Sequence, residues 1–283
     1  MKTKTIGTMD QDDDHGEQNK KIKIEKYKEL REIFDQKDET GFLAIGELGI
    51  DYRVTEAGLF LPSGTAFLDK LFEDLIKDNY INRKEIFLDA GSGDGRVNHI
   101  AAINGVEKSI GIEYSVDILE KSKKQTHKFE EANIIKKDRV KLIAGDFTKL
   151  DSYAKEGIEV GNVKAFFNYL NGWKELLAFI DENGTVGTKL ILVNQQFSVE
   201  DRVVQGILKF DSIDLLKIVK YIFWKDSDEA EIITPKILRE LKKVDSTIED
   251  QHVILDISDK DQVSVSDSDN YYVTTVYLCE KKK

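Results

Sequence analysis

An acid followed by three alternating glycines is the feature of this sequence with the clearest chemical use. Residues 89–96 read Asp-Ala-Gly-Ser-Gly-Asp-Gly-Arg and follow the apolar run Ile86–Leu88. Gly91, Gly93 and Gly95 let the backbone take positive φ and let a ligand approach the main chain, because no Cβ is in the way. A helix that opens after this turn would point its first N–H groups at the ligand. The pattern predicts a ligand site at this loop.

Two more acids follow apolar runs further along the chain. Glu113 ends the run Ser109–Glu113, and Asp146 follows the run Val140–Ala144, with Phe147 after it. A carboxylate that accepts hydrogen bonds from both hydroxyls of a ribose makes a charge-assisted contact of defined geometry, which suits Glu113. Acids around the loop favour a cationic cofactor with a sulfonium group, and they would be costly beside the pyrophosphate of a dinucleotide.

A nicotinamide or flavin enzyme is the main alternative on these grounds. Its loop would read G-x-G-x-x-G, whereas this chain has G-x-G-x-G, with Arg96 where the last glycine should be. Asp89 also lies two residues before Gly91. These departures favour the sulfonium cofactor, and a purely structural tight turn is the remaining alternative.

Apolar runs alternate with amphipathic stretches, which is the order of a parallel sheet with crossover helices. Ligands of such sheets bind beyond the carboxyl ends of the strands. The fold class is therefore α/β, with a doubly wound, mostly parallel sheet and a C-terminal antiparallel hairpin. The expected strands are Ile86–Ala90, Ser109–Glu113, Val140–Ala144, Val163–Asn168 and Thr188–Asn194, with the hairpin formed by Val253–Ile257 and Tyr271–Cys279. The expected helices are Lys21–Asp35, Thr65–Asp78, Val97–Asn104, Val116–Asn133 and Trp173–Ile180.

The chain is expected to divide along its length. Residues 1–20 have almost no apolar side chains and are expected to be disordered. The later parts are a helical N-terminal cap with a glycine-punctuated loop (21–80), a cofactor-binding core (81–194), a mostly helical insertion (195–250) and a C-terminal hairpin that completes the sheet (251–283).

The three motifs together, in this order and at these spacings, resemble the class I S-adenosylmethionine-dependent methyltransferases. They are the loop 89–96, Gly111-Ile-Glu113 and Gly145-Asp146-Phe147. The resemblance covers roughly Asn82 to Asn194, and it implies a Rossmann-like seven-strand sheet and S-adenosyl-L-methionine as the cofactor.

The resemblance also implies where each residue meets the cofactor. Asp89 lies near the methionine end, and the glycines of the loop lie beneath it. Glu113 accepts hydrogen bonds from the ribose hydroxyls. Asp146 faces the exocyclic amine of adenine, with Phe147 beside the ring.

The methyl acceptor is expected after the fourth strand, at Asn168 and Tyr169. These side chains offer an amide oxygen and a phenol that could orient an amine, and Asn168 is also a candidate cofactor contact. The nearby sequence contains no obvious general base. Trp173 could form a wall for a cation, or it could simply pack at the start of a helix.

The segment Leu61-Pro-Ser-Gly-Thr65 adds a weaker similarity to seven-strand protein-lysine methyltransferases. In those enzymes a loop before the first strand closes over the cofactor, which implies a gating function for Tyr52, Arg53 and Thr65. A protein lysine amine is the expected acceptor. A small-molecule N- or O-methyltransferase is the alternative, and a non-catalytic binding module with the same fold is an alternative of another class.

Composition limits the partners. Lys and Arg number 42 against 53 Asp and Glu, and the formal net charge of −11 makes nucleic acid an unfavourable partner and a basic protein an acceptable one. The sequence has no apolar run of membrane-spanning length, and a cytoplasmic location is expected. No metal site is expected, because His99, His127 and His252 lie far apart in the sequence. His99 is expected to be a packed or surface residue, and Cys279 a packed strand residue.

Overall fold

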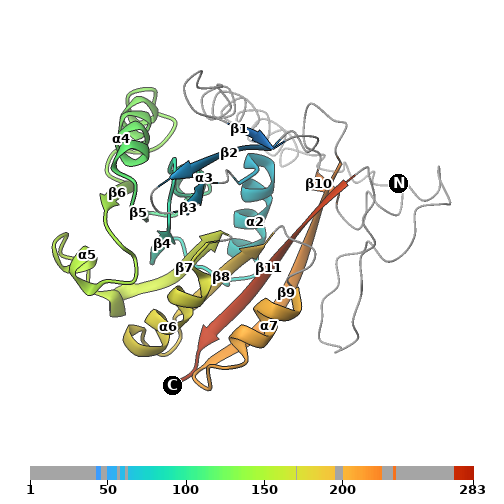
Figure 1. The fold of residues 1–283 in the computed structure, drawn as a ribbon. Helices are drawn as coiled ribbons and strands as arrows, with labels where there is room; N and C mark the ends of the chain where they lie inside the picture. The colour runs from blue at the N-terminus through green and yellow to red at the C-terminus, as the bar shows by residue number, and fades with distance from the viewer. Residues whose placement is uncertain are drawn as a thin grey trace, which may run out of the picture. The chain divides into compact units, whose positions relative to one another are not determined.

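A mixed sheet forms the centre of the fold (Figure 1). The computed structural model describes residues 43–45, 50–55, 58–60, 63–169, 171–194, 200–224, 232–233 and 271–283. The order of the strands in the sheet is β10-β9-β11-β8-β7-β4-β5-β6. Five strands are parallel: β4 (Ile86–Ala90), β5 (Lys108–Glu113), β6 (Val140–Ala144), β7 (Val163–Tyr169) and β8 (Lys189–Asn194). Three are antiparallel to their neighbours: β9 (Ile213–Trp224), the two-residue β10 (Ile232–Ile233) and β11 (Tyr271–Lys281).

The strand order reverses between β4 and β7. The chain runs outward from β4 through β5 to β6, returns to β7 beside β4, and continues to β8. In doubly wound sheets, ligands bind outside the carboxyl ends of the strands at this reversal. The glycine loop follows β4, and Asn168 and Tyr169 end β7, so the fold brings the two predicted halves of the site to the same edge.

Helices cover both faces of the sheet. The side chains of α2 (Thr65–Lys77) and α3 (Arg96–Ile103) share one core with alternate strand residues such as Phe87 and Phe167. The other core joins α5 (Leu150–Ala154), α6 (Trp173–Asn183) and α7 (Glu200–Ile207) to the opposite faces of the same strands. α4 (Val116–Glu131) follows β5, and a short 3-10 turn at Val160–Asn162 precedes β7. Strands buried on both faces read as continuous apolar runs, which explains why they were recognisable in the sequence.

The fold class expected from the sequence is confirmed. β4 and β6 have the predicted bounds, and the other core strands and helices differ from the prediction only by a few residues at their ends. The seven longer strands form the mostly parallel sheet with antiparallel C-terminal strands. The helix expected at 21–35 and the disorder expected at 1–20 lie outside the described residues.

The expectation of a mostly helical insertion at 195–250 was wrong for residues 213–224. α7 is helical, but the apolar stretch that followed it is strand β9, which pairs along its length with β11. A dense apolar run fits a buried strand as well as a helix stripe, and β-branched residues such as Ile213, Ile218 and Val219 favour the strand. The long-range pairing with β11 decides between them.

Strand β11, the second strand of the predicted hairpin, pairs with strands other than the one expected. β11 lies between β8 and β9 and is antiparallel to both, so the described C-terminal antiparallel pair consists of β9 and β11. The segment Val253–Ile257, the expected partner, lies outside the described residues.

The stretch read as a loop before α2 contains a small antiparallel sheet. Its strands are β1 (Leu43–Ile45), β2 (Ile50–Thr55) and β3 (Gly58–Phe60). Ile50, Tyr52 and Val54 alternate with polar residues, which is the period of a strand. Gly46, Gly49 and Gly58 in the same stretch are typical of a loop, which is why the sequence predicts one here.

In the part of the chain that the structure describes, no helix is long and apolar enough to cross a membrane.

A buried lysine ties the end of β11 to α6. The Nζ atom of Lys281 donates to the main-chain oxygens of Ile180, at 3.0 Å, and of Asp181. The Ile180 carbonyl also accepts from the Gly184 N–H at 2.9 Å. Carbonyl groups later in the last turn of a helix lack a donor within the helix, and a cation is favourable there. Lys281 therefore fastens the helix end to the strand that completes the sheet.

We expect Lys281→Met to lower the free energy of unfolding by about 1–3 kcal/mol, because the Asp181 carbonyl then loses its buried donor. Urea unfolding monitored by circular dichroism measures the change. Lys283→Met is the control, since Lys283 is exposed. Equal losses in the two variants would contradict this account of Lys281.

Candidate functional site

The glycine loop has the backbone geometry that its sequence predicts. The φ angles of Gly91, Gly93 and Gly95 are 86°, 54° and 77°, in the left-handed region that favours glycine. The N–H groups of Gly91 and Ser92 both donate to the carbonyl of Ile112, at 2.9 Å each. These bonds fix the loop to the end of β5.

Glu113 holds the same loop from its side chain. Its Oε2 accepts a hydrogen bond from the Gly93 N–H at 2.7 Å, and its Oε1 accepts one from the Ser115 N–H at 2.8 Å. Its side chain is buried. An ionised carboxylate offers about four acceptor positions, so it can hold main-chain amides and suits ribose hydroxyls as donors.

Asp89 lies at the end of β4 and is only 2% exposed. Its Oδ2 has no hydrogen-bond partner among the described residues. Burial raises the pKa of this carboxyl well above its usual range, and the negative charges of Glu113 and Asp94 raise it further. A cation bound beside Asp89 would relieve both effects, so the site suits the positive charges of a sulfonium and an ammonium group.

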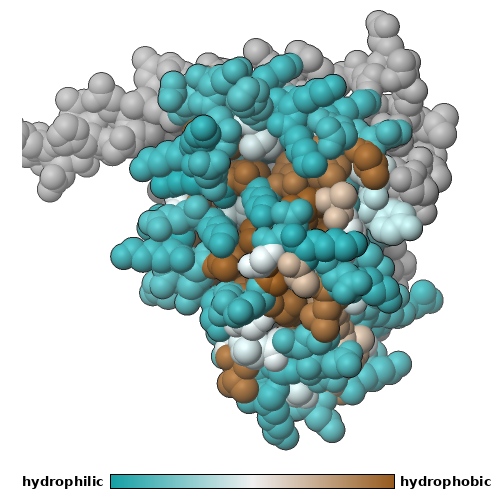
Figure 2. Space-filling model, turned by 90° about the vertical axis from the view of Figure 1, so that its left-hand side faces the viewer, coloured by the Kyte–Doolittle hydropathy of each residue, from teal (hydrophilic) through white to brown (hydrophobic). Residues whose placement is uncertain are grey.

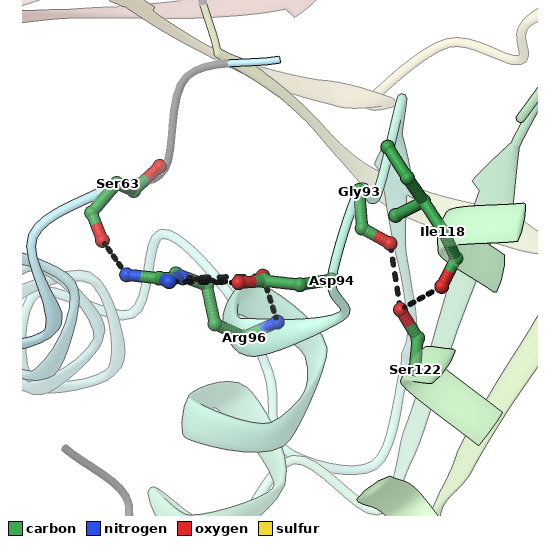
Figure 3. A network of polar contacts seen from close by, with 6 residues as sticks. All are labelled: Ser63, Gly93, Asp94, Arg96, Ile118 and Ser122. Atoms are coloured by element: carbon green, nitrogen blue, oxygen red, sulfur yellow. Dashed lines mark hydrogen bonds and ion pairs between the residues drawn. The ribbon is translucent and has the colours of Figure 1, made fainter. Parts of the chain in front are cut away.

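α4 contacts the glycine loop through the side chain of Ser122 (Figure 3). The Ser122 hydroxyl oxygen lies 2.9 Å from each of the carbonyl oxygens of Gly93 and Ile118, and its single proton is shared between them. Thr126 donates to the Ser122 carbonyl, and His99 Nε2 lies 2.8 Å from the Thr126 hydroxyl. His99 is fully buried, and burial lowers the pKa of its ring to about 3. It is a packed, neutral residue, one of the two states expected from the sequence.

Asp146 and Phe147 follow β6 and border the loop. The Asp146 Oδ1 accepts hydrogen bonds from the N–H and the hydroxyl of Thr148, at 2.8 and 2.6 Å. The Phe147 ring lies between Gly91 and Gly172: a Cβ on Gly172 would be 2.7 Å from its Cζ, and one on Gly91 would be 3.9 Å from its Cε1. An apolar ring therefore joins the glycine loop to the start of α6.

Asn168 joins the ends of β4 and β7. Its Nδ2 donates to the carbonyls of Ala90, at 2.7 Å, and of Asn171, at 2.6 Å. Its Oδ1 is buried without a partner in the described part of the chain. The amide donor is thus occupied by the fold, and the oxygen is the atom that can accept from a ligand.

Tyr169 points to the face covered by α2 and α3. Its hydroxyl is buried with no partner among the residues described. Burial raises the pKa of the phenol above its ordinary value, while the nearby charge of Arg96 acts in the opposite direction. An unpaired buried hydroxyl costs about 1–3 kcal/mol, so it points to a ligand that completes it.

Arg96 is a site residue that the sequence reasoning missed. Its guanidinium pairs with Asp94, two residues earlier, and its Nη1 donates to the carbonyl of Ser63 at 3.0 Å (Figure 3). The sequence signal was an arginine directly after the last glycine, which was interpreted only as the loss of a dinucleotide motif.

The residues expected to form the acceptor wall and the gating loop have other surroundings or lie outside the described side chains. The Trp173 ring packs against Gly206 of α7 and belongs to the core on that face, which favours packing over a ligand wall. Thr65 is buried at the start of α2. The side chains of Tyr52 and Arg53 lie outside the described residues.

Large apolar side chains are exposed next to the site. Tyr114 and Val116, each 56% exposed, follow β5, and Leu150, 52% exposed, begins α5 after β6. Figure 2 views the molecule from the side of α5 and β6 and shows apolar side chains in the middle of that face, surrounded by hydrophilic ones. The described residues contain no group of three His, Cys, Asp or Glu that could hold a metal ion.

The arrangement suits a reaction that needs positioning more than proton transfer. Acids, an amide oxygen and a phenol meet at one edge of the sheet, and His99, the buried histidine behind the loop, is neutral and packed. An in-line displacement with an activated leaving group requires mainly that the nucleophile be held on the axis and water excluded.

Comparisons with known proteins agree with this geometry. Residues 66–169 match the family model described as "Histone methylation protein DOT1". None of the curated proteins matches the chain. A proposed RNA methyltransferase from Pyrococcus horikoshii is similar in structure, with a TM-score of 0.50 and 12% identity over 91% of this chain and 99% of that one.

Two further solved structures are also similar to the chain. An RNA methyltransferase from Salinibacter ruber, in complex with S-adenosyl-L-homocysteine, has a TM-score of 0.37 and 22% identity over 47% of this chain and 78% of its own. The Bacillus subtilis tRNA methyltransferase TrmK has a TM-score of 0.43 and 14% identity over 79% of this chain and 68% of its own.

The DOT1 family comprises class I S-adenosylmethionine-dependent methyltransferases, and the match spans the strands that carry the glycine loop, Glu113, Asp146 and Asn168. The resemblance stated from the sequence is confirmed, as are the class of enzyme and its cofactor. The contacts of individual residues with that cofactor remain predictions.

We expect Glu113→Gln to weaken S-adenosylmethionine binding roughly 10- to 100-fold, the effect of losing a charge-assisted hydrogen bond and loosening the loop. Calorimetric titration of the folded variant measures it. Glu120→Gln, on the exposed face of α4, should bind as the wild type does. Unchanged affinity in Glu113→Gln would exclude the ribose contact.

Burial of the His99 ring makes the free energy of unfolding depend on pH. The pKa of its ring is about 3 in the folded chain, against the ordinary histidine value of 6.5 in an unfolded one. The unfolded chain therefore binds a proton here as pH falls from 6.5 towards 3 and the folded chain does not, so the free energy of unfolding falls over that window.

Urea unfolding at about pH 7.5 and about pH 5 tests this expectation. His99→Gln, which cannot titrate, should lose part of the pH dependence. His127→Gln, on the exposed side of α4, should keep it. The same pH dependence in His99→Gln and in the wild type would rule out His99 as the source.

Proposed function

We propose that this S-adenosylmethionine-dependent methyltransferase transfers its methyl group to a lysine amine of a basic protein. The observation that carries the proposal is the match of residues 66–169 to a family model described as a histone methylation protein. That stretch runs from α2 to the end of β7 and so contains both the cofactor loop and the residues expected to meet the acceptor.

The sequence at the end of β7 supports an amine other than those of nucleobases. Enzymes that methylate exocyclic amines of bases or a glutamine amide carry an Asn/Asp-Pro-Pro-Tyr signature there. This chain has Asn168-Tyr169 without prolines, and its two prolines, Pro62 and Pro235, lie elsewhere.

Charge supports a basic acceptor. The formal net charge of −11 attracts a lysine-rich partner and repels a phosphate backbone. RNA is therefore the less favourable acceptor, even though structural neighbours include proteins described as RNA methyltransferases.

In the proposed reaction each residue acts by holding a group in place. The cofactor supplies the activated methyl group. Glu113 binds its ribose, and the charge of Asp89 stabilises its cationic end. The Asn168 Oδ1 and the Tyr169 hydroxyl accept hydrogen bonds from the acceptor amine and turn its lone pair towards the methyl group. The amine loses its proton to solvent before transfer, because a neutral nucleophile is required.

A cytoplasmic location and the division of the chain into a cap, a core, an insertion and a C-terminal pair are further parts of the proposal.

The acceptor class can be tested directly with the full chain. We expect methyl label from S-adenosylmethionine to enter the lysines of a histone mixture, used as a basic protein probe, and to be found there by mass spectrometry. Label in total RNA or in small amines and alcohols, with none in protein, would overturn the proposal.

Tyr169→Phe tests the acceptor contact. We expect kcat to fall roughly tenfold, which corresponds to one hydrogen bond of about 1.4 kcal/mol, with S-adenosylmethionine affinity unchanged. Tyr80→Phe is the control, because the Tyr80 hydroxyl bonds the carbonyls of Leu190 and Cys279 within the sheet. It should lower stability and leave kcat unchanged. A Tyr169→Phe enzyme with wild-type kcat would remove Tyr169 from the site.

A further inference from the structure

The Arg96 side chain joins two segments that are distant in the sequence. Arg96 is the first residue of α3 and only 6% exposed. Its Nε donates to the Asp94 Oδ1 and Oδ2 at 3.1 and 2.9 Å, and its Nη2 lies 2.7 Å from Oδ2. Its Nη1 donates to the carbonyl of Ser63, 33 residues earlier and just before α2, at 3.0 Å (Figure 3).

The turn itself does not need this side chain. The Arg96 N–H donates to the Asp94 Oδ1 at 3.1 Å, so Asp94 holds the first N–H of α3 whatever side chain position 96 carries. The cost of burying a guanidinium is large unless it is paired and hydrogen-bonded. The chain nevertheless keeps a buried arginine here, and besides its pairing with Asp94 the guanidinium donates to the Ser63 carbonyl.

The same guanidinium lies near both reacting sides of the site. Asp94, its ion-pair partner, belongs to the glycine loop, and its charge acts on Asp89. The positive charge of Arg96 also acts on Tyr169, at the end of β7. Arg96 is therefore located among the cofactor loop, the residue expected to meet the acceptor and the segment that leads into α2.

We propose that Arg96 is a positioning residue that couples occupancy of the cofactor loop to the position of the segment at Ser63, and thereby to binding of the acceptor. A cationic cofactor changes the electrostatic field at Asp94 and so the strength of its ion pair with Arg96. This ion pair orients the guanidinium, whose Nη1 binds the Ser63 carbonyl. By linkage, a segment fixed at Ser63 favours cofactor binding by the same factor. The identity of the acceptor rests on the proposed function, but the coupling does not.

Hydrogen exchange of the full chain, with and without S-adenosylmethionine and with no acceptor present, tests the coupling. In the wild type we expect the cofactor to slow exchange both in the glycine loop and in the peptide that covers 63–68. In Arg96→Met the loop should still be protected by saturating cofactor, and the protection at 63–68 should be lost. Equal cofactor-dependent protection at 63–68 in both proteins would overturn the proposal.

Arg96→Lys keeps the positive charge but cannot bind Asp94 through two nitrogens and also reach Ser63, so it serves if the methionine variant does not fold. We expect the KM for the acceptor to rise roughly tenfold or more in this variant, with a smaller change in kcat. A change in kcat alone, with KM and exchange at 63–68 as in the wild type, would also overturn the proposal.

Arg83→Met is the matched control. Arg83 also donates to a main-chain carbonyl, that of Asn104, at the opposite end of α3 and in an exposed position. It should change neither exchange at 63–68 nor KM. The two proposals fail separately. Coupling without methylation of lysine would refute only the acceptor, and lysine methylation with unaltered exchange in the Arg96 variants would refute only the coupling.

Discussion

The site depends on holding a glycine-rich main-chain turn in place from three directions. Three residues at positive φ would leave the loop free to move if only its own backbone held it. The Ile112 carbonyl fixes its start, the Glu113 carboxylate fixes Gly93 from β5, and the Ser122 hydroxyl fixes the same residue from α4. Glu113 thus acts in the fold as well as at the ligand. Because Glu113 must bind both the main chain of the loop and the ligand, few other residue types can replace it.

The electrostatics follow from the same constraint. Burial raises the pKa of Asp89, and fixing the loop places Glu113 and Asp94 close enough to raise it further. One of these acids, Asp94, is neutralised by Arg96, and another, Glu113, is held by backbone amides. Asp89 is left as the carboxylate whose buried oxygen a cation would complete. A loop of this kind selects a positively charged cofactor through the fold around it.

The elements that depend only on neighbouring residues could be predicted from the sequence. β4, β6 and the glycine loop could be predicted because each needs only neighbouring residues: an apolar run, an acid and glycines at fixed spacing. Strand β9 could not, because its apolar stretch fits a helix equally well and only its pairing with β11 decides. The Ser63 contact of Arg96 was invisible for the same reason, since it spans 33 residues. Asn168 was found by type, but its donor proved to be used by the fold.

The position of β11 sets the order in which the fold can be completed. Glu280 of β11 lies 91 residues after Lys189, its partner on β8, and β11 separates β8 from β9. During synthesis the parallel strands β4 to β8 can therefore assemble first, with the edge of β8 open and able to pair with another chain. Only when β11 is inserted are that edge, the Tyr80 hydroxyl bonded to Cys279 and the last turn of α6 bonded to Lys281 all closed together. The cofactor loop lies on the half of the sheet that forms early, so a bound ligand could stabilise the nascent domain before the chain is finished.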